Sequence, residues 1–465
     1  MSSVQIVVAR LYKYCYNTNM KKNDEFEVLI EDMGSSGEGI AHKDGVTIFV
    51  PFAIKGENVL VHVLKVKESI AWAKIITIKS YCEHRVEPNC KYFEKCGGCA
   101  LEHVNSEYEL LVKQQKIETA FKKNAGITLE KVKMFDSDKL YSYRNKCAFP
   151  IRMVDGVASV CMFKGNSHIP IKINRCELAD EKINEVVSIF NKFLRESSVS
   201  AFDELTNIGL VKFLVVRVID NVPLITIVIN TKKMPNIDGL IKKLELRFAK
   251  FGLNLNINTT NNNVILSSNF VHVCGEKELV ASEKGISYPV SSMSFLQIND
   301  YIKNIIYDKV LDAIEKQDLV IDAYSGAGLL SAIMAKKAKY VYGIEIIKDA
   351  TENANNLKIS NNIENLTNIN GDCLIELPRL VECLNSNQVK VVLDPPRKGC
   401  DKKVIDAIIK ANVKEIIYIS CNPATLARDA KILIDAGYKI KSVEGFNMFP
   451  QTEHVETLAF FEKEI

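Results

Sequence analysis

The sequence predicts an α/β protein with an open, mostly parallel C-terminal sheet, preceded by a small β-barrel and a central α/β domain that holds a metal cluster. Three observations carry this prediction. From about residue 288, apolar runs alternate with helical segments, as in parallel sheets covered by helices. Between residues 23 and 80, short β-branched runs are separated by glycine-containing turns, as in small barrels. Seven of the 13 cysteines fall between residues 82 and 176.

The composition is that of a folded chain with no strong charge bias. Of 465 residues, 47% are hydrophobic and 25% are charged, which excludes bulk disorder. The net charge is only +3, so a basic surface for nucleic acid would have to be local. No apolar run approaches the roughly 18 residues of a membrane span, and residues 1–10 lack the charged lead of a signal peptide. We therefore expect a cytoplasmic monomer, in which clustered cysteines indicate metal binding more than disulfides.

Changes in pattern divide the chain into four segments. They are an N-terminal extension (1–22), a β-barrel (23–80), a central domain with the cysteine block (81–285) and the α/β domain (286–465). In the central domain we expect a helix at 107–123, buried strands at 211–218 and 224–229, and turns in the Asn-rich stretch 254–263. In the last domain we expect strands at 319–323, 340–345, 366–369, 389–393, 415–420, 440–445 and 456–461.

A glycine loop follows the first strand of the last domain. Residues Asp322–Gly328 have the pattern D-x-x-x-G-x-G, which lets the backbone turn tightly and approach a ligand. This pattern suits S-adenosylmethionine better than a dinucleotide, because no pyrophosphate has to be cradled. Glu345 ends the next strand, where a carboxylate can accept hydrogen bonds from ribose hydroxyls. A plain strand-to-helix connection has similar glycines, so the prediction depends also on the motifs that follow.

Three further residues predict a covalent reaction at the carboxyl edge of the sheet. Asp394 ends the fourth strand and is held there by two prolines. Cys421 ends the fifth strand, and the following helix should lower the pKa of its thiol. Glu456 starts the last strand. A nucleophile, a base and a methyl donor together suit methylation at carbon 5 of uracil, which a thiolate activates by adding to carbon 6.

The cysteine block contains a candidate metal site. Cys90, Cys96 and Cys99 are separated by five residues and then two, with two glycines that let the chain wrap tightly. Cys176 is the best candidate for a fourth ligand, and Cys82 is a less favoured one. On spacing alone, zinc and an iron–sulfur cluster both remain open.

Taken together, these motifs resemble the RNA uracil-C5 methyltransferases, specifically the branch that acts on 23S rRNA, over nearly the whole chain. The motifs are Ser294-Phe-Leu-Gln-Ile-Asn299, Asp322–Gly328, Asp394-Pro-Pro-Arg-Lys-Gly399, Ser420-Cys-Asn-Pro423 and His454-Val-Glu-Thr457. The resemblance implies a Rossmann-like methyltransferase domain that makes 5-methyluridine, with Cys421 as nucleophile and Glu456 as proton acceptor. It also implies S-adenosylmethionine contacts at Gln297, Tyr324, Glu345 and Asp394, and a [4Fe–4S] cluster on Cys90, Cys96, Cys99 and Cys176.

The resemblance also implies that the barrel is a TRAM domain that binds RNA. Residues 21–80 carry eight lysines and nine acidic residues, so any RNA contact there must be local, at lysines such as Lys65, Lys67 and Lys74. The stretch 141–146 mixes aromatic and basic residues and suits base stacking, although a solvated strand end has the same composition.

Three alternatives remain open. The first is the same chemistry on tRNA, although relatives acting on tRNA often lack the barrel and the cysteine cluster. The second is an RNA cytosine-C5 methyltransferase, which would usually carry a cysteine where Pro396 and Arg397 stand. The third is a non-catalytic RNA-binding iron–sulfur protein, against which Cys421 and Glu456 argue.

Overall fold

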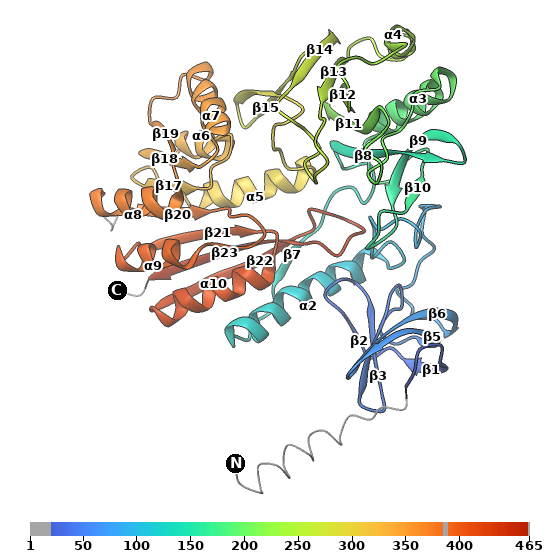
Figure 1. Ribbon diagram of the computed structural model, residues 1–465. Coiled ribbons are helices and arrows are strands. Elements are labelled where there is room, and N and C mark those ends of the chain that lie inside the picture. Colours follow the sequence, from blue (N-terminus) through green and yellow to red (C-terminus); the bar gives the residue numbers. More distant parts are fainter. Residues whose placement is uncertain (1–19, 385–388, 464–465) are drawn as a thin grey trace, which may run out of the picture. The chain divides into compact units, whose positions relative to one another are not determined.

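The computed structural model describes residues 20–384 and 389–463 (Figure 1). It divides into two compact units, which we describe separately. One comprises Met1–Lys113 and Gln451–Glu453, and the other comprises Gln114–Pro450 and His454–Ile465. The expected N-terminal extension lies, except for its last three residues, outside the described residues. In the described part of the chain, no helix has the length and apolar character needed to cross a membrane.

The first unit contains a six-stranded sheet in the order β1-β5-β6-β4-β3-β2. Its strands alternate buried and exposed side chains, so that Val46, Ile48 and Val50 of one strand all enter the core. No β-branched run marks strand β3 in the sequence, because it contains a glycine and a histidine. The bounds are β1 (Glu25–Leu29), β2 (Asp32–Met33), β3 (Gly39–Lys43), β4 (Val46–Val50), β5 (Asn58–Lys67) and β6 (Ile70–Ser80).

The second unit begins within helix α2 (Ser106–Ala125) and contains a seven-stranded sheet in the order β10-β9-β8-β11-β12-β13-β14. Helix α3 (Glu181–Ser197) packs against this sheet and buries Val187 and Phe190. The other bounds are β8 (Lys146–Val154), β9 (Val157–Phe163), β10 (Pro170–Lys172), β11 (Val211–Ile219), β12 (Val222–Ile229), α4 (Ile237–Glu245), β13 (Gly252–Ile257) and β14 (Phe270–Gly275).

The expectation of turns from residue 254 is partly wrong. Asn254 and Asn256 belong to strand β13 and are buried. Asn256 Nδ2 donates to the carbonyls of Ser267 (2.8 Å) and Asn269 (3.3 Å), so its amide is satisfied inside the protein. Because these side chains find such partners, a run of asparagines can continue a strand.

The same unit contains the predicted α/β sheet, with eight strands in the order β19-β18-β17-β20-β21-β23-β22-β7. All seven expected strands are confirmed within about two residues. The bounds are β7 (Lys133–Phe135), β17 (Leu319–Ala323), β18 (Tyr340–Glu345), β19 (Leu366–Asn370), β20 (Val389–Leu393), β21 (Glu415–Ser420), β22 (Tyr438–Phe446) and β23 (Glu456–Lys463).

Helices cover both faces of this sheet (Figure 1). Neighbouring residues of β20 point to opposite faces: Val391 joins a core with α8 to α10, and Val392 joins a core with α5 and α6. A hairpin of β15 (Leu279–Glu283) and β16 (Ile286–Val290) precedes the sheet. The helices are α5 (Asp300–Asp312), α6 (Leu329–Ala335), α7 (Lys348–Ser360), α8 (Cys373–Cys383), α9 (Lys402–Lys410) and α10 (Pro423–Asp435).

The topology brings the ends of several strands to one edge. Strands β17, β18, β20 and β21 are parallel, so their carboxyl ends share that edge. Strand β23 runs antiparallel to β21, with Thr457 opposite Ser420. Glu456, the first residue of β23, therefore lies at the edge where Cys421 follows β21.

Candidate active site

Cys421 stands between the end of β21 and the first residue of α10. Asn422 caps the helix by accepting a hydrogen bond from the Ala424 amide at 3.1 Å, and Pro423 occupies the first helical position, as expected. The Ser420 hydroxyl accepts from the Asn422 amide at 3.1 Å, which stabilises this tight turn. The turn holds the Cys421 thiol half-buried at the carboxyl edge.

The expected lowering of the thiol pKa is wrong for the free protein. Burial raises the pKa of Cys421, and the carboxyls of Glu456 and Asp394 raise it further. The Arg397 guanidinium and a backbone amide act in the opposite direction. Desolvation outweighs the favourable helix terminus, because a thiolate loses more by leaving water than it gains from partial charges.

Glu456 is buried at the start of β23, opposite Phe446 of β22. Burial and, secondarily, the neighbouring Asp394 raise its pKa well above the usual range of a glutamate, while Arg397 acts against this. A carboxyl with a raised pKa is better matched to taking up and releasing a proton near neutral pH.

Two further carboxyls lie buried along the same edge. Burial raises the pKa of Asp394 to about 7 and that of Asp322 to about 7. Asp322 accepts a hydrogen bond from the Ser331 hydroxyl. Neither carboxyl forms an ion pair with any residue that the structure describes. The edge is therefore short of positive charge, and a cationic ligand would stabilise the ionised form of both groups.

The glycine loop has the backbone geometry that its sequence predicts. Tyr324, Gly326 and Gly328 all have positive φ, at 66°, 57° and 78°. A Cβ on Gly328 would lie 2.6 Å from the Ala354 Cβ, so only glycine fits there. The Glu345 carboxylate accepts from the Gly326 amide at 3.0 Å, which ties the loop to the end of β18.

Most of the predicted residues are brought together. Charge interactions link Cys421, Glu456 and Asp394, and they also link Asp394 to Asp322 and Asp322 to Glu345. Tyr324 continues directly from β17 at the same edge.

Gln297 lies on the segment before α5, half-buried, and its carbonyl accepts from Asn145 Nδ2 at 3.0 Å. No described contact joins Gln297 to Cys421 or Asp394. In the same segment, the side chain of Phe295 is 80% exposed. This residue was not singled out from the sequence alone. Its position within the motif of residues 294–299 could have drawn attention to it.

Of the four cysteines predicted to hold a metal, three belong to the first unit and one to the second. Cys90, Cys96 and Cys99 lie half-buried in an irregular segment of the first unit, where the Cys90 amide donates to Glu102 at 2.8 Å. Cys176 belongs to the second unit, where its amide donates to Asn184 at 2.9 Å. Within residues 20–384 and 389–463, no three or more His, Cys, Asp or Glu side chains are grouped so as to hold a metal ion.

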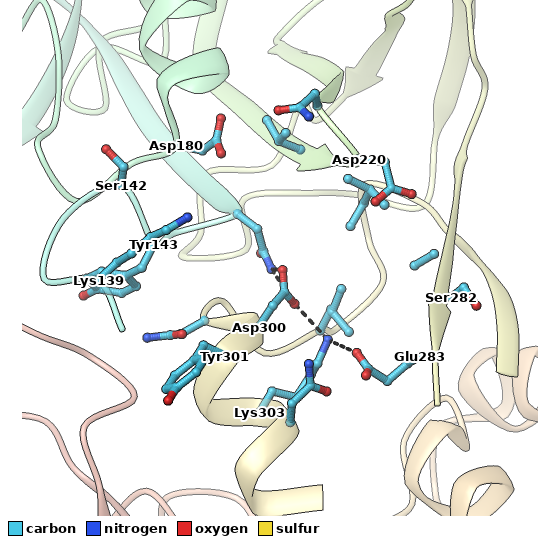
Figure 2. A pocket seen from close by; sticks show the side chains of 18 of the residues that line it. Lys139, Ser142, Tyr143, Asp180, Asp220, Ser282, Glu283, Asp300, Tyr301 and Lys303 are labelled. Atoms are coloured by element: carbon cyan, nitrogen blue, oxygen red, sulfur yellow. Dashed lines mark hydrogen bonds and ion pairs between the residues drawn. The ribbon is translucent and has the colours of Figure 1, made fainter. Parts of the chain in front are cut away.

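A cavity of about 430 Å³ lies elsewhere in the second unit (Figure 2). Figure 2 shows Lys303 between Glu283 and Asp300, at 2.6 and 2.8 Å from their carboxylates. Leu296 and Asn299, which flank Gln297, line this cavity, but Cys421, Glu456 and Asp394 do not. Its described lining contains no cysteine, so the candidate nucleophile lies at the sheet edge instead.

The first unit exposes an aromatic and basic surface. Phe49 and Trp72 stack on neighbouring strands with ring centroids 6.4 Å apart, and Lys65 Nζ lies 5.5 Å from the Trp72 ring. Lys67 and Lys74 share this face by register and alternation. We call these five residues the Trp72 face. In contrast to Lys55 and Lys79, which pair with Asp32 and Glu27, none of its lysines pairs with a described carboxylate.

Within the stretch 141–146, Tyr143 and Lys146 do not offer the stacking surface that its composition suggested. Tyr143 is buried, and its hydroxyl donates to the Pro450 carbonyl at 3.0 Å. Lys146 Nζ donates to the Ser292 carbonyl at 2.8 Å. These side chains therefore serve contacts within the second unit.

Comparisons with known proteins identify the family to which the chain belongs. Residues 105–464 match the family described as tRNA (uracil-5-)-methyltransferase, and residues 20–76 match the TRAM domain. An uncharacterized RNA methyltransferase of Clostridium acetobutylicum is 34% identical over 453 residues, covering 96% of this chain and 98% of the relative. One from Clostridium tetani is 35% identical over 444 residues, covering 94% and 96%.

Among solved structures, one match is the crystal structure of Pyrococcus abyssi tRNA (uracil-54, C5)-methyltransferase in complex with S-adenosyl-L-homocysteine. It covers 94% of this chain and 100% of that one, with a TM-score of 0.75 and 22% identity. This likeness confirms the predicted α/β fold, whereas the metal cluster of the central domain stays a prediction. The family match and the relatives confirm the resemblance to uracil-5-methyltransferases with a TRAM domain. The chain therefore belongs to the tRNA (uracil-5-)-methyltransferase family.

Proposed function

We propose that the protein transfers a methyl group from S-adenosylmethionine to carbon 5 of a uridine in RNA, through a covalent adduct with Cys421. The observation that carries this proposal is the gathering of Cys421, Glu456 and Asp394 at one sheet edge in a chain of this family. The same gathering argues against a non-catalytic RNA-binding protein, which needs no buried base beside a thiol.

The edge fits S-adenosylmethionine, which supplies a methyl group on a positively charged sulfur. The glycine loop leaves room near its backbone, since a Cβ on Gly326 would meet nothing within 4 Å. Asp322 and Asp394 offer negative charge without a described cation partner. We assign the cofactor contacts to Gln297, Tyr324, Glu345 and Asp394.

The residues of the chain then carry the covalent steps. The half-buried Cys421 thiol first loses its proton to solvent, and the thiolate bonds to carbon 6 of uracil. The electron pair displaced from the double bond makes carbon 5 nucleophilic. Carbon 5 takes the methyl group, and the donor sulfur becomes neutral. Glu456 removes the proton from carbon 5, the electron pair restores the double bond, and the bond to the Cys421 sulfur breaks.

Glu456→Gln tests this division of roles. Without a base, addition and methylation proceed but elimination stops, so the methylated RNA remains bonded to Cys421. The variant should give a denaturation-resistant, methyl-labelled protein–RNA adduct that disappears in the double variant with Cys421→Ala. Product release at a near wild-type rate with no adduct would exclude Glu456 as the base.

For the RNA we favour a uridine in 23S rRNA, with tRNA as the alternative. The resemblance supports rRNA through the combination of TRAM domain and cysteine set, whereas the P. abyssi neighbour is named for uracil-54 of tRNA. The target base must leave any stack to reach Cys421. We place the enzyme in the cytoplasm as a monomer. Mapping 5-methyluridine in rRNA and tRNA from cells with and without the gene distinguishes the substrates.

We also propose that Cys90, Cys96, Cys99 and Cys176 hold a [4Fe–4S] cluster with a structural role. A buried histidine without described hydrogen-bond partners supports the presence of a bound group near the cysteine segment of the first unit. His103 is fully buried, its ring lies 5.5 Å from that of Phe93, and neither ring nitrogen has a hydrogen-bond partner among the described residues.

Anaerobically purified protein should contain about four irons and four sulfides per chain. Stoichiometric zinc without sulfide would overturn the cluster assignment. Substituting Cys176 by serine should lower the iron content, whereas the same change at the exposed Cys383 should not.

A further inference from the structure

The loop after β20, residues 394–400, is fastened to helix α10 by side chains on one face of that helix. Asn422 Nδ2 donates to the Arg397 carbonyl at 3.1 Å, and the Thr425 hydroxyl donates to the same carbonyl at 3.4 Å. One turn further, Arg428 Nη2 donates to the carbonyls of Lys398 and Cys400, both at 3.1 Å. These residues are spaced three apart, so they share a helix face.

Asp429 completes this attachment from inside the protein. Its side chain is 1% exposed, and its Oδ2 accepts from the Cys400 amide at 2.9 Å and the Tyr418 hydroxyl at 2.7 Å. Its Oδ1 accepts from Arg428 Nε at 2.8 Å. The approach is close: Gly399 has φ of +78°, and a Cβ there would lie 2.6 Å from Arg428 Nη2.

This attachment joins the two halves of the candidate active site. Asp394 opens the loop, and Cys421 directly precedes the cap of α10. Resting on the proposed function, we infer that Arg428 and Asp429 are positioning residues: they hold the 394–400 loop on α10 so that Asp394 and Arg397 stay beside Cys421. Neither residue is assigned a step in the reaction.

The pKa of the Cys421 thiol should depend on this positioning. The charged groups that act on Cys421 are Asp394 and Arg397 from the loop and Glu456 from β23. Arg397 alone among these favours the thiolate, and its carbonyl is anchored by α10. If the loop moves away, the thiol loses both Arg397 and Asp394 but keeps Glu456. Because Arg397 has the larger effect of the two, the pKa of the thiol rises.

The test compares Arg428→Met with Lys431→Met. Both side chains lie on α10, are about half exposed and pair with an aspartate, but Lys431 pairs with Asp435 away from the loop. Alkylation of Cys421 by iodoacetamide is followed by mass spectrometry over pH, without RNA or cofactor. Methylation kinetics are measured in parallel.

Arg428→Met should move the alkylation profile to higher pH. It should lower kcat on the order of 100-fold, as for a displaced reacting group, with KM for S-adenosylmethionine nearly unchanged. Arg428→Lys, which keeps one donor, should recover part of both effects, and Lys431→Met should match the wild type.

An unchanged alkylation profile in folded Arg428→Met would overturn the inference, whether or not kcat falls. If Arg428→Met does not fold, Thr425→Val is used instead. It removes the hydroxyl that bonds the carbonyls of Arg397 and Asn422, and it should shift the profile less, in the same direction. No shift there would also overturn it. If the wild-type protein methylates no RNA but Arg428→Met still shifts the alkylation profile, the proposed function is refuted and the positioning role is retained.

Discussion

The two ends of strand β20 differ in whether their buried charged side chains have ion-pair partners. At its amino end, the buried Lys390 bonds Asp318 at 3.0 Å and Glu415 at 3.1 Å, so each buried charge is compensated. At its carboxyl end, neither Asp394 nor the nearby Glu456 forms an ion pair with a described residue, and Arg397 offsets the raised pKa of Glu456 only in part. One strand thus separates a stabilising ion-pair network from an uncompensated edge. Unpaired buried charge is costly, so its presence indicates a ligand that compensates it.

Cys421→Ala gives the largest effect expected at the carboxyl edge. Without a thiol, carbon 5 of uracil is not activated, and methylation should be abolished. Binding of S-adenosylmethionine, measured by calorimetry, should remain close to wild type, because the thiol is not among the proposed cofactor contacts. Cys383→Ala, at an exposed cysteine, serves as the control. Substantial turnover by Cys421→Ala would refute the covalent mechanism.

Substitutions at the two ends of β20 should separate activity from stability. Asp394→Asn should sharply reduce cofactor binding and methylation without lowering thermal stability, because it removes an uncompensated buried charge. Lys390→Met should leave Asp318 and Glu415 unpaired and cost roughly 2 kcal/mol of unfolding free energy. The remaining folded protein should keep its activity. Equal effects of both changes on stability would contradict the comparison.

Cofactor affinity should depend on pH at this edge. The pKa of Asp394 is raised to about 7, and a cationic ligand binds its ionised form. Affinity should therefore fall about tenfold between pH 8 and pH 6. The folding contribution has the opposite sign. Because the folded carboxyl holds its proton more tightly than the unfolded one, it stabilises most below pH 4 and loses this effect as pH rises to 7. A flat affinity would show that Asp394 is already ionised.

The Trp72 face offers a second comparison, between lysines that lack a described carboxylate partner and lysines that have one. Its unpaired lysines should attract the phosphates of single-stranded RNA, and its rings should stack on bases. Trp72→Ala should weaken RNA binding about fivefold, at the low end of the stacking contribution, whereas Trp72→Phe should weaken it less. Trp72 is the single tryptophan of the chain, so both variants lack its fluorescence, and RNA binding is measured by the fluorescence anisotropy of a labelled RNA. Lys79→Ala, at a paired lysine, is the matched control.

The sequence was most informative where one local pattern determined the structure. The parallel strands are rich in apolar and β-branched residues, so this pattern and the turn residues between them locate them in the sequence. Topology then places Asp394 and Cys421 at one edge. Strand β13 was missed because the partners of Asn256 lie more than ten residues away. The raised pKa of Cys421 was missed because it depends on burial and on the nearby Glu456. The sequence alone gives neither the burial of the thiol nor its distance from Glu456.

The position of β23 has a consequence for chains that are made incompletely. In the sheet, β23 lies between β21 and β22, although it follows both in the sequence. A chain that stopped before residue 456 would contain the nucleophile but not the proposed base, and could capture RNA without releasing it. Such a chain would also lack the strand that joins β22 to the sheet. Release of the product therefore depends on the completed fold, because the strand that completes the sheet also carries the group that ends the reaction.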